Sequence, residues 1–184
     1  MKKRYKVFLF FLATAILGVA ATLAYASTRF PIRHIEIIEA NAGELDVSLI
    51  LAIIMAESSF DVNAQSHAGA QGLMQLMPPT AQDMAERMGK ADFMHYHIWR
   101  PETNIAIGTF YLNWLYARYS GNIDLMLAAY NAGLGRVDRW LADPEFSQDG
   151  ISLDAIPFPE TYNYLNRIRT FQWIYRVLLA MPWN

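Results

Sequence analysis

The sequence contains no cysteine and few charged residues. The absence of cysteine among 184 residues excludes a disulfide framework, thiolate metal ligands, a cysteine nucleophile and a lipid-modified cysteine, and it leaves the redox compartment open. Charged residues make up only 17% of the chain and the net charge is −2, whereas binding of nucleic acid needs a basic surface. We therefore expect no nucleic-acid partner.

Strand-like alternation of apolar and polar residues is also missing after the first thirty residues, where almost every segment has a helical period. Apolar residues make up 54% of the chain, which excludes a disordered protein and indicates a membrane segment, a large core or both. The length suits one domain of ordinary size plus a short appendage. We predict a mainly α single domain with little or no β structure.

The first 28 residues predict an export segment. Four basic residues precede the run 7–28, which carries no charge. At about 1.5 Å per residue this run is long enough to cross a bilayer core of about 30 Å, whereas Ala24-Tyr25-Ala26 has the small-x-small form of a cleavage site. Two alternatives stay open: a membrane anchor formed by residues 7–28, or a signal peptide cleaved near Ala26. Either one places residues 29–184 outside the cytoplasm.

Caps and helix breakers divide residues 29–184 into short helices. Asp46 is the expected N-cap of a helix that ends at Glu57, and Thr103 or Asn104 is the expected cap of a central helix. The other expected helices are 32–42, 80–88, 124–132, 136–143 and 160–181, and the polar, glycine-containing stretch 60–78 is expected as a long loop or an irregular hairpin.

Glu57 is the strongest candidate for a catalytic residue. It ends an apolar helix, where desolvation and the negative pole of the helix dipole both raise the pKa of a carboxyl. A carboxylic acid that stays protonated near neutral pH is suited to protonate a glycosidic oxygen, usually together with a second carboxylate. No second carboxylate has a spacing that places it opposite Glu57.

Four ordered blocks are more specific than this single residue. They are E-S-S-F at 57–60, A-Q-S at 64–66, G-A-Q-G-L-M-Q-L-M-P at 69–78 and A-A-Y-N-A-G at 128–133, with weaker matches at 104–112 and 156–161. In these blocks the chain resembles the soluble-type lytic transglycosylases. The resemblance implies a goose-type lysozyme-like fold and a catalytic domain over residues 29–184.

The resemblance also implies a reaction. Members of the family cleave the β-1,4 bond between N-acetylmuramic acid and N-acetylglucosamine in peptidoglycan and leave a 1,6-anhydro ring. One glutamate, matched here by Glu57, acts first as the acid and then as the base, so the missing second carboxylate agrees with this mechanism. The implied partner is the peptidoglycan strand, and no cofactor is implied.

The same resemblance assigns roles to other residues. Tyr130 matches the tyrosine whose hydroxyl orients the catalytic carboxyl. The substrate-binding residues implied are Ser66 and Gln75 as hydrogen-bonding groups, Met74 as an apolar wall under a sugar ring, Asn131 as part of a turn that lines the site, and Glu160 as a supporting acid. Tyr162 stands where the family often has arginine, and Tyr162 and Tyr164 are candidates for stacking on sugar faces.

The sequence fits three other interpretations less well. His95 and His97 lack a third ligand at a recognised spacing, so we expect no metal site. A hydrolysing lysozyme on the same fold would need a carboxylate that activates water. An inactive glycan-binding module or scaffold of an envelope-spanning machine, with an unidentified partner, would have no use for a buried acid.

Overall fold

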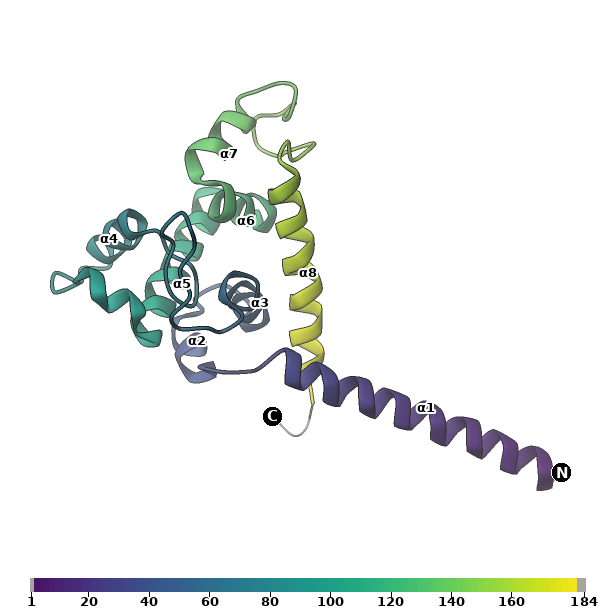
Figure 1. Cartoon of the computed structure of the whole chain (residues 1–184). Coiled ribbons are helices and arrows are strands. Elements are labelled where there is room, and N and C mark those ends of the chain that lie inside the picture. The colour runs from purple at the N-terminus through teal and green to yellow at the C-terminus, as the bar shows by residue number, and fades with distance from the viewer. Residues whose placement is uncertain (1, 182–184) are drawn as a thin grey trace.

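The computed structural model describes residues 2–181, which form helices and loops without a β-strand (Figure 1). Met1 and residues 182–184, which belong to the expected segments 1–28 and 29–184, lie outside the described residues. The helices are α1 (Lys2–Arg29), α2 (Ile35–Asn41), α3 (Val47–Ser58), α4 (Pro78–Arg87), the 3-10 helix η1 (His95–Trp99), α5 (Pro101–Arg118), α6 (Ile123–Ala132), α7 (Leu134–Leu141) and α8 (Pro159–Leu179). The expected mainly α fold class is confirmed.

Helix α3 is the central helix of the domain. Its residues from Ser48 to Ile54 are all buried, as expected for a helix that is apolar on every side. Asp46 is its N-cap, as predicted, and its carboxylate accepts a hydrogen bond from the Ser48 backbone N–H at 2.8 Å. The helix packs against α8, and the hydrogen bond between Tyr164 and Glu57 places the C-terminal end of α3 beside the first part of α8.

The predicted start of α5 is wrong. The helix begins at Pro101, because proline is favoured in the first turn, where its missing N–H costs no hydrogen bond. Asn104 is therefore not a cap but a buried residue inside the first turn. Its Oδ1 accepts from the Met74 N–H at 2.8 Å, and its Nδ2 donates to the carbonyls of Gln71 at 3.1 Å and Ile98 at 2.9 Å. Asn104 thus fastens the loop before α4 to the core.

The remaining helices agree with the expected ranges to within a few residues. The largest difference is at α2, which begins at Ile35 rather than residue 32 because His34 has a left-handed backbone with φ 57°. The stretch after α3 is an irregular hairpin, in which Gln71 forms isolated bridges with Gln65 and Leu76. Ser59 and Phe60 both have positive φ where this hairpin leaves α3, so the chain turns sharply just after Glu57.

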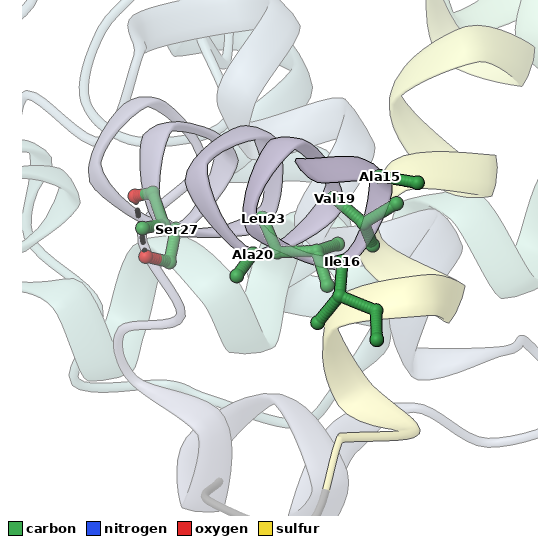
Figure 2. Close-up of a pocket in the computed structure, with 7 residues that line it drawn as sticks. Ala15, Ile16, Val19, Ala20, Leu23 and Ser27 are labelled. Carbon is green, nitrogen blue, oxygen red and sulfur yellow. Dashed lines mark hydrogen bonds between the residues drawn. The ribbon is translucent and has the colours of Figure 1, made fainter. Parts of the chain in front are cut away.

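Helix α1 extends away from the domain (Figure 1). Its segment Arg4–Arg29 has a mean hydropathy of 2.4 and is long and apolar enough to cross a bilayer, properties that a signal sequence shares. A depression of about 560 Å³ is lined by residues of α1 alone, such as Ile16, Val19 and Leu23 (Figure 2). Because a single helix lines it, this depression is the apolar surface of α1 rather than a binding site.

Candidate active site

Glu57 lies in the last turn of α3 and is partly exposed. Its Oε1 accepts a hydrogen bond of 2.7 Å from the hydroxyl of Tyr164, a buried residue near the start of α8. Arg167 lies one turn further along α8, with its guanidinium 5.7 Å from the centre of the Tyr164 ring. The candidate acid of the sequence is therefore held by a group from the other end of the chain.

The surroundings of Glu57 keep its carboxyl partly protonated at neutral pH. Burial raises the pKa of Glu57 from 4.5 to about 7, while the hydrogen bond from Tyr164 and the positive charge of Arg167 favour the carboxylate and oppose that rise. A group with a pKa near the working pH can both donate and accept a proton. The tuning expected from the position of Glu57 is thus present, and burial is its main cause.

Tyr130 does not make the hydrogen bond that was expected of it. Its hydroxyl donates to the backbone carbonyl of Met74 at 2.7 Å, and since a hydroxyl has only one proton, the donor to Glu57 is Tyr164 instead. Burial first, and then the negative charges of Glu57 and Tyr111, raise the pKa of Tyr130 well above its ordinary value. Tyr130 therefore lies near Glu57 but ties α6 to the loop before α4.

Sequence reasoning misses the role of Tyr164, for which it predicts only stacking on a sugar face. Tyr164 is 2% exposed, so its ring has no free face for a sugar. One sequence signal could have indicated this role. Tyr164 is a tyrosine on the apolar side of α8, and its neighbours on that side, Leu165 and Ile168, have no polar group that could bind its hydroxyl. Such a hydroxyl needs a partner inside the protein.

The expected role of Met74 as a wall under a sugar ring is contradicted. Its side chain is fully buried, and the sulfur lies against Gly108 and Thr109 of α5. A side chain with no exposed surface cannot contact a sugar in this conformation. What Met74 offers to the site is its backbone, which joins Asn104 and Tyr130.

Gly108→Ala is expected to destabilise the fold by about 1–3 kcal/mol, because the added methyl group would overlap the Met74 sulfur in a filled core. Urea unfolding measures the free energy. The matched control is Gly135→Ala in α7, where the nearest atom is the flexible Arg139 guanidinium at 3.8 Å and a helical alanine is favoured. Equal stability of the two variants would contradict the packing described for Met74.

The other expected site residues hold the loops and helix ends around Glu57. The Ser66 hydroxyl accepts from the Ala70 N–H at 3.0 Å. The Gln75 amide donates to the carbonyls of Ala64 and Gly72, both at 2.9 Å. Each side chain therefore braces the hairpin that follows α3.

Two further expected residues lie where α6 meets α8. The Asn131 Oδ1 accepts a hydrogen bond of 2.9 Å from the hydroxyl of Thr161. Glu160, the residue before Thr161, is exposed in the first turn of α8. Asn131 thus joins the two helices that carry Tyr130 and Tyr164.

A cavity of about 250 Å³ lies beside this group. It is lined by Gln75, Leu76, Met77, Thr80, Tyr111, Tyr130, Asn131, Ala132 and Gly133. The rings of Tyr111 and Tyr130 are 5.5 Å apart. Three of the expected site residues, Gln75, Tyr130 and Asn131, therefore share one cavity that combines amide groups with aromatic faces, a composition suited to a sugar ring.

His97 of the connector has a structural role. The Nδ1 of His97 accepts a hydrogen bond of 3.1 Å from the Met94 N–H and so closes the first turn of η1. In the part of the chain that the structure describes, no group of three or more His, Asp or Glu residues is close enough to hold a metal ion.

Comparison with known proteins identifies the family. Residues 35–151 match the family described as the transglycosylase SLT domain. The chain belongs to this family. The soluble lytic murein transglycosylase of Salmonella typhimurium is 34% identical over 169 residues, which cover 87% of this chain and 26% of that protein.

Solved structures of SLT-domain proteins show the same fold. The 70 kDa soluble lytic transglycosylase of Escherichia coli matches with a TM-score of 0.74 at 31% identity, over 84% of this chain and 26% of the other. An inactive glutamate-to-glutamine variant of the lytic transglycosylase Slt of Pseudomonas aeruginosa matches with the same TM-score at 36% identity, over 85% of this chain and 26% of the other. The chain thus spans about a quarter of the length of these relatives, and the expected lysozyme-like fold is confirmed.

Proposed function

We propose that this chain is a lytic transglycosylase that cleaves the β-1,4 bond between N-acetylmuramic acid and N-acetylglucosamine in peptidoglycan. The observation that carries the proposal is the Glu57 carboxyl, with its pKa raised to about 7 by burial and its hydrogen bond from Tyr164. The SLT-domain family supports the substrate class. The inactive Pseudomonas aeruginosa variant, in which one glutamate is replaced by glutamine, supports a catalytic glutamate.

Glu57 serves first as the acid. The protonated carboxyl donates its proton to the glycosidic oxygen, the bond from that oxygen to C1 of N-acetylmuramic acid breaks, and N-acetylglucosamine leaves with a free 4-hydroxyl. The positive charge that develops at C1 is stabilised by the acetamido group of the same sugar. Glu57 is then a carboxylate, which the Tyr164 hydroxyl and the Arg167 charge stabilise.

Glu57 next serves as the base. The carboxylate accepts the proton of the C6 hydroxyl on the same N-acetylmuramic acid, and the C6 oxygen forms a bond to C1. The product is the 1,6-anhydro sugar, the carboxyl regains its proton, and no water is consumed. One carboxyl therefore completes the cycle.

The remaining residues have supporting roles in this proposal. Gln75 and Asn131 bind a sugar in the cavity that they line with Tyr130, and Ser66 keeps the hairpin in place beside the strand. Glu160 contributes a negative charge at the exposed start of α8. Residues 29–184 form the catalytic unit on the periplasmic side of the inner membrane.

Digestion of purified sacculi followed by mass spectrometry tests the reaction. The expected fragments end in anhydromuramic acid and are lighter by one water than the products of a lysozyme. Fragments that carry a reducing N-acetylmuramic acid would instead identify a hydrolase, and unchanged sacculi would favour an inactive scaffold.

Tyr164→Phe is expected to move the alkaline limb of the pH profile of kcat/KM to higher pH. The limb reflects loss of the Glu57 proton, and removing a hydrogen bond that favours the carboxylate raises the pKa of Glu57 further. The rate at the optimum should fall about tenfold because the carboxyl loses its orientation. Initial rates on soluble glycan strands between pH 5 and about pH 9 provide the measurement.

Tyr162→Phe is the matched control for this prediction. Tyr162 is on the same helix and is 55% exposed, so loss of its hydroxyl should leave the profile unchanged. Arg167→Gln should shift the limb in the same direction as Tyr164→Phe, because the Arg167 charge also favours the carboxylate. A shift to lower pH in either variant would refute the assigned electrostatics.

A further inference from the structure

The joint between α1 and the domain is packed. The Phe30 N–H donates to the Ala26 carbonyl at 2.8 Å, which continues the hydrogen-bonding pattern of α1. The Phe30 ring meets the rings of Phe171 and Tyr175 of α8 edge-on, with centroid distances of 5.1 and 5.8 Å. The Tyr175 hydroxyl donates to the Pro31 carbonyl at 3.3 Å. These contacts fix the end of α1 to the C-terminal part of α8 without a flexible linker.

The same contacts bear on cleavage of the N-terminal segment. Ala26 is half-buried against the core that Phe30 joins, so the segment near the expected cleavage position is part of the packed joint. Cleavage after Ala26 would remove the acceptor of the Phe30 N–H and the packing of the Ala26 side chain against the core. The packing therefore favours retention of α1.

Trp173 is an unusually exposed side chain close to this joint. It is 67% exposed, whereas Phe171 and Tyr175, two residues away on either side, face the domain. Trp173 therefore lies on the face of α8 opposite α3. Figure 1 shows α1 running away from the domain on that same side of α8.

Two arginine side chains flank Trp173 on α8. Arg169 and Arg176 lie four residues before and three residues after it on the same helix, and each also makes an exposed ion pair, with Asp124 and Asp46 respectively. Arg29, the last residue of α1, and Arg33, in the loop that follows α1, are also exposed. An indole bordered by arginine side chains has the composition that proteins place at the headgroup level of a membrane.

We propose that the chain keeps α1 as a membrane anchor and that the outer face of α8 around Trp173 docks onto the surface of the same bilayer. Trp173 enters the headgroup region, and Arg29 and Arg33 contact anionic lipid headgroups. The occupant of this face is thus a lipid surface. The length of α1 supports the geometry, because the uncharged run 7–28 fills the bilayer core and brings Arg29 to its outer edge.

Docking would set where the candidate active site works. Tyr164 lies nine residues before Trp173 on α8, a distance of about 14 Å along the helix axis. Glu57 would then be held close to the membrane surface. This consequence rests on the proposed function and means that glycan strands near the membrane are the accessible substrate, whereas the docking itself does not depend on catalysis.

The test uses the full chain in vesicles of phosphatidylcholine and phosphatidylglycerol whose acyl chains are brominated near the headgroup. Bromine quenches only tryptophans that reach the lipid. Trp173→Phe is expected to remove most of the quenching. Trp114→Phe, a replacement on α5, is the matched control and should leave the quenching nearly unchanged. Quenching that survives in the Trp173 variant would overturn the docking.

The charge of the lipid tests the role of the arginines. In vesicles of phosphatidylcholine alone, and in the double variant Arg29→Gln/Arg33→Gln, the quenching of Trp173 should fall. Equal quenching in all lipids would overturn the role of the arginines.

The mass of the chain recovered from bacterial membranes should equal that of the intact protein. A mature chain that begins at Ser27 would overturn retention of the anchor. Because none of these measurements uses glycan cleavage, their failure is distinguishable from failure of the proposed function.

Discussion

Glu57→Gln is expected to lower the rate of peptidoglycan cleavage by about a thousandfold or more. The amide has nearly the same shape as the carboxyl and can still accept the hydrogen bond from Tyr164, but it has no proton of suitable acidity to give to the glycosidic oxygen. Soluble anhydro-fragments released from sacculi provide the measurement. Binding of glycan strands should be largely retained, because the cavity residues are unchanged.

Glu39→Gln is the matched control. Glu39 is an exposed residue of α2, and its replacement makes the same glutamate-to-glutamine exchange without touching the candidate site. The rate should equal that of the unmodified chain. Full activity in Glu57→Gln would reject the proposed mechanism, whereas loss of activity in Glu39→Gln would show that the assay responds to charge rather than to the catalytic acid.

Glu57→Gln should also change how the free energy of unfolding depends on pH. The pKa of Glu57 is about 7 in the folded chain against an ordinary value of 4.5, so the folded state holds the proton more tightly than the unfolded state. The unmodified chain should therefore lose stability relative to Glu57→Gln as the pH rises from about 4.5 to about 7, and the difference should then level off. A difference that stays constant with pH would show that Glu57 is not desolvated.

Asn104→Ala is expected to destabilise the fold on the order of 3 kcal/mol, because one truncation leaves the Met74 N–H and the Ile98 carbonyl without their partner and removes one of the two hydrogen bonds to the Gln71 carbonyl. Chemical unfolding provides the free energy. The hairpin that carries Gln75 should also lose its position, so we expect a fall in activity at temperatures where the chain is still folded.

Asn163→Ala is the control for this prediction. Asn163 is exposed on α8, so its truncation should change the free energy of unfolding by less than about 0.5 kcal/mol. Comparable stability of the two asparagine variants would contradict the role of Asn104 as a fastening between α5 and the hairpin.

Local sequence signals predicted the fold well where a neighbouring residue decides the outcome. Asp46 caps α3 because its carboxylate reaches an N–H two residues away. The prediction failed at α5 for an equally local reason, since Pro101 is a stronger start signal than Thr103 or Asn104. Helix α2 lacks the first three residues of the predicted helix because His34 has a left-handed backbone, and nothing in the local sequence predicts that conformation for a histidine.

The candidate site was only partly predictable. Glu57 was identified because an ionisable group at the end of an apolar helix conflicts with its local environment. The hydrogen bonds of Tyr130 and Tyr164 could not be assigned, because each hydroxyl has one proton and both lie within the same small region. The family resemblance implied that Met74 lies under a sugar, and the sequence could not show that Gly108 of α5 leaves the space that the Met74 sulfur fills.

The sequence alone determined that the chain is helical, that its first helix is apolar enough for a membrane, and that an acid ends its central helix. These properties depend on periodicity, composition and residues within one or two turns of each other. The tertiary structure alone decided which tyrosine holds the acid, which side chains reach the cavity, and which face of α8 is left to solvent. Those outcomes depend on groups as far apart as Glu57 and Tyr164, whose meeting is set by the packing of α3 against α8 and by no local signal.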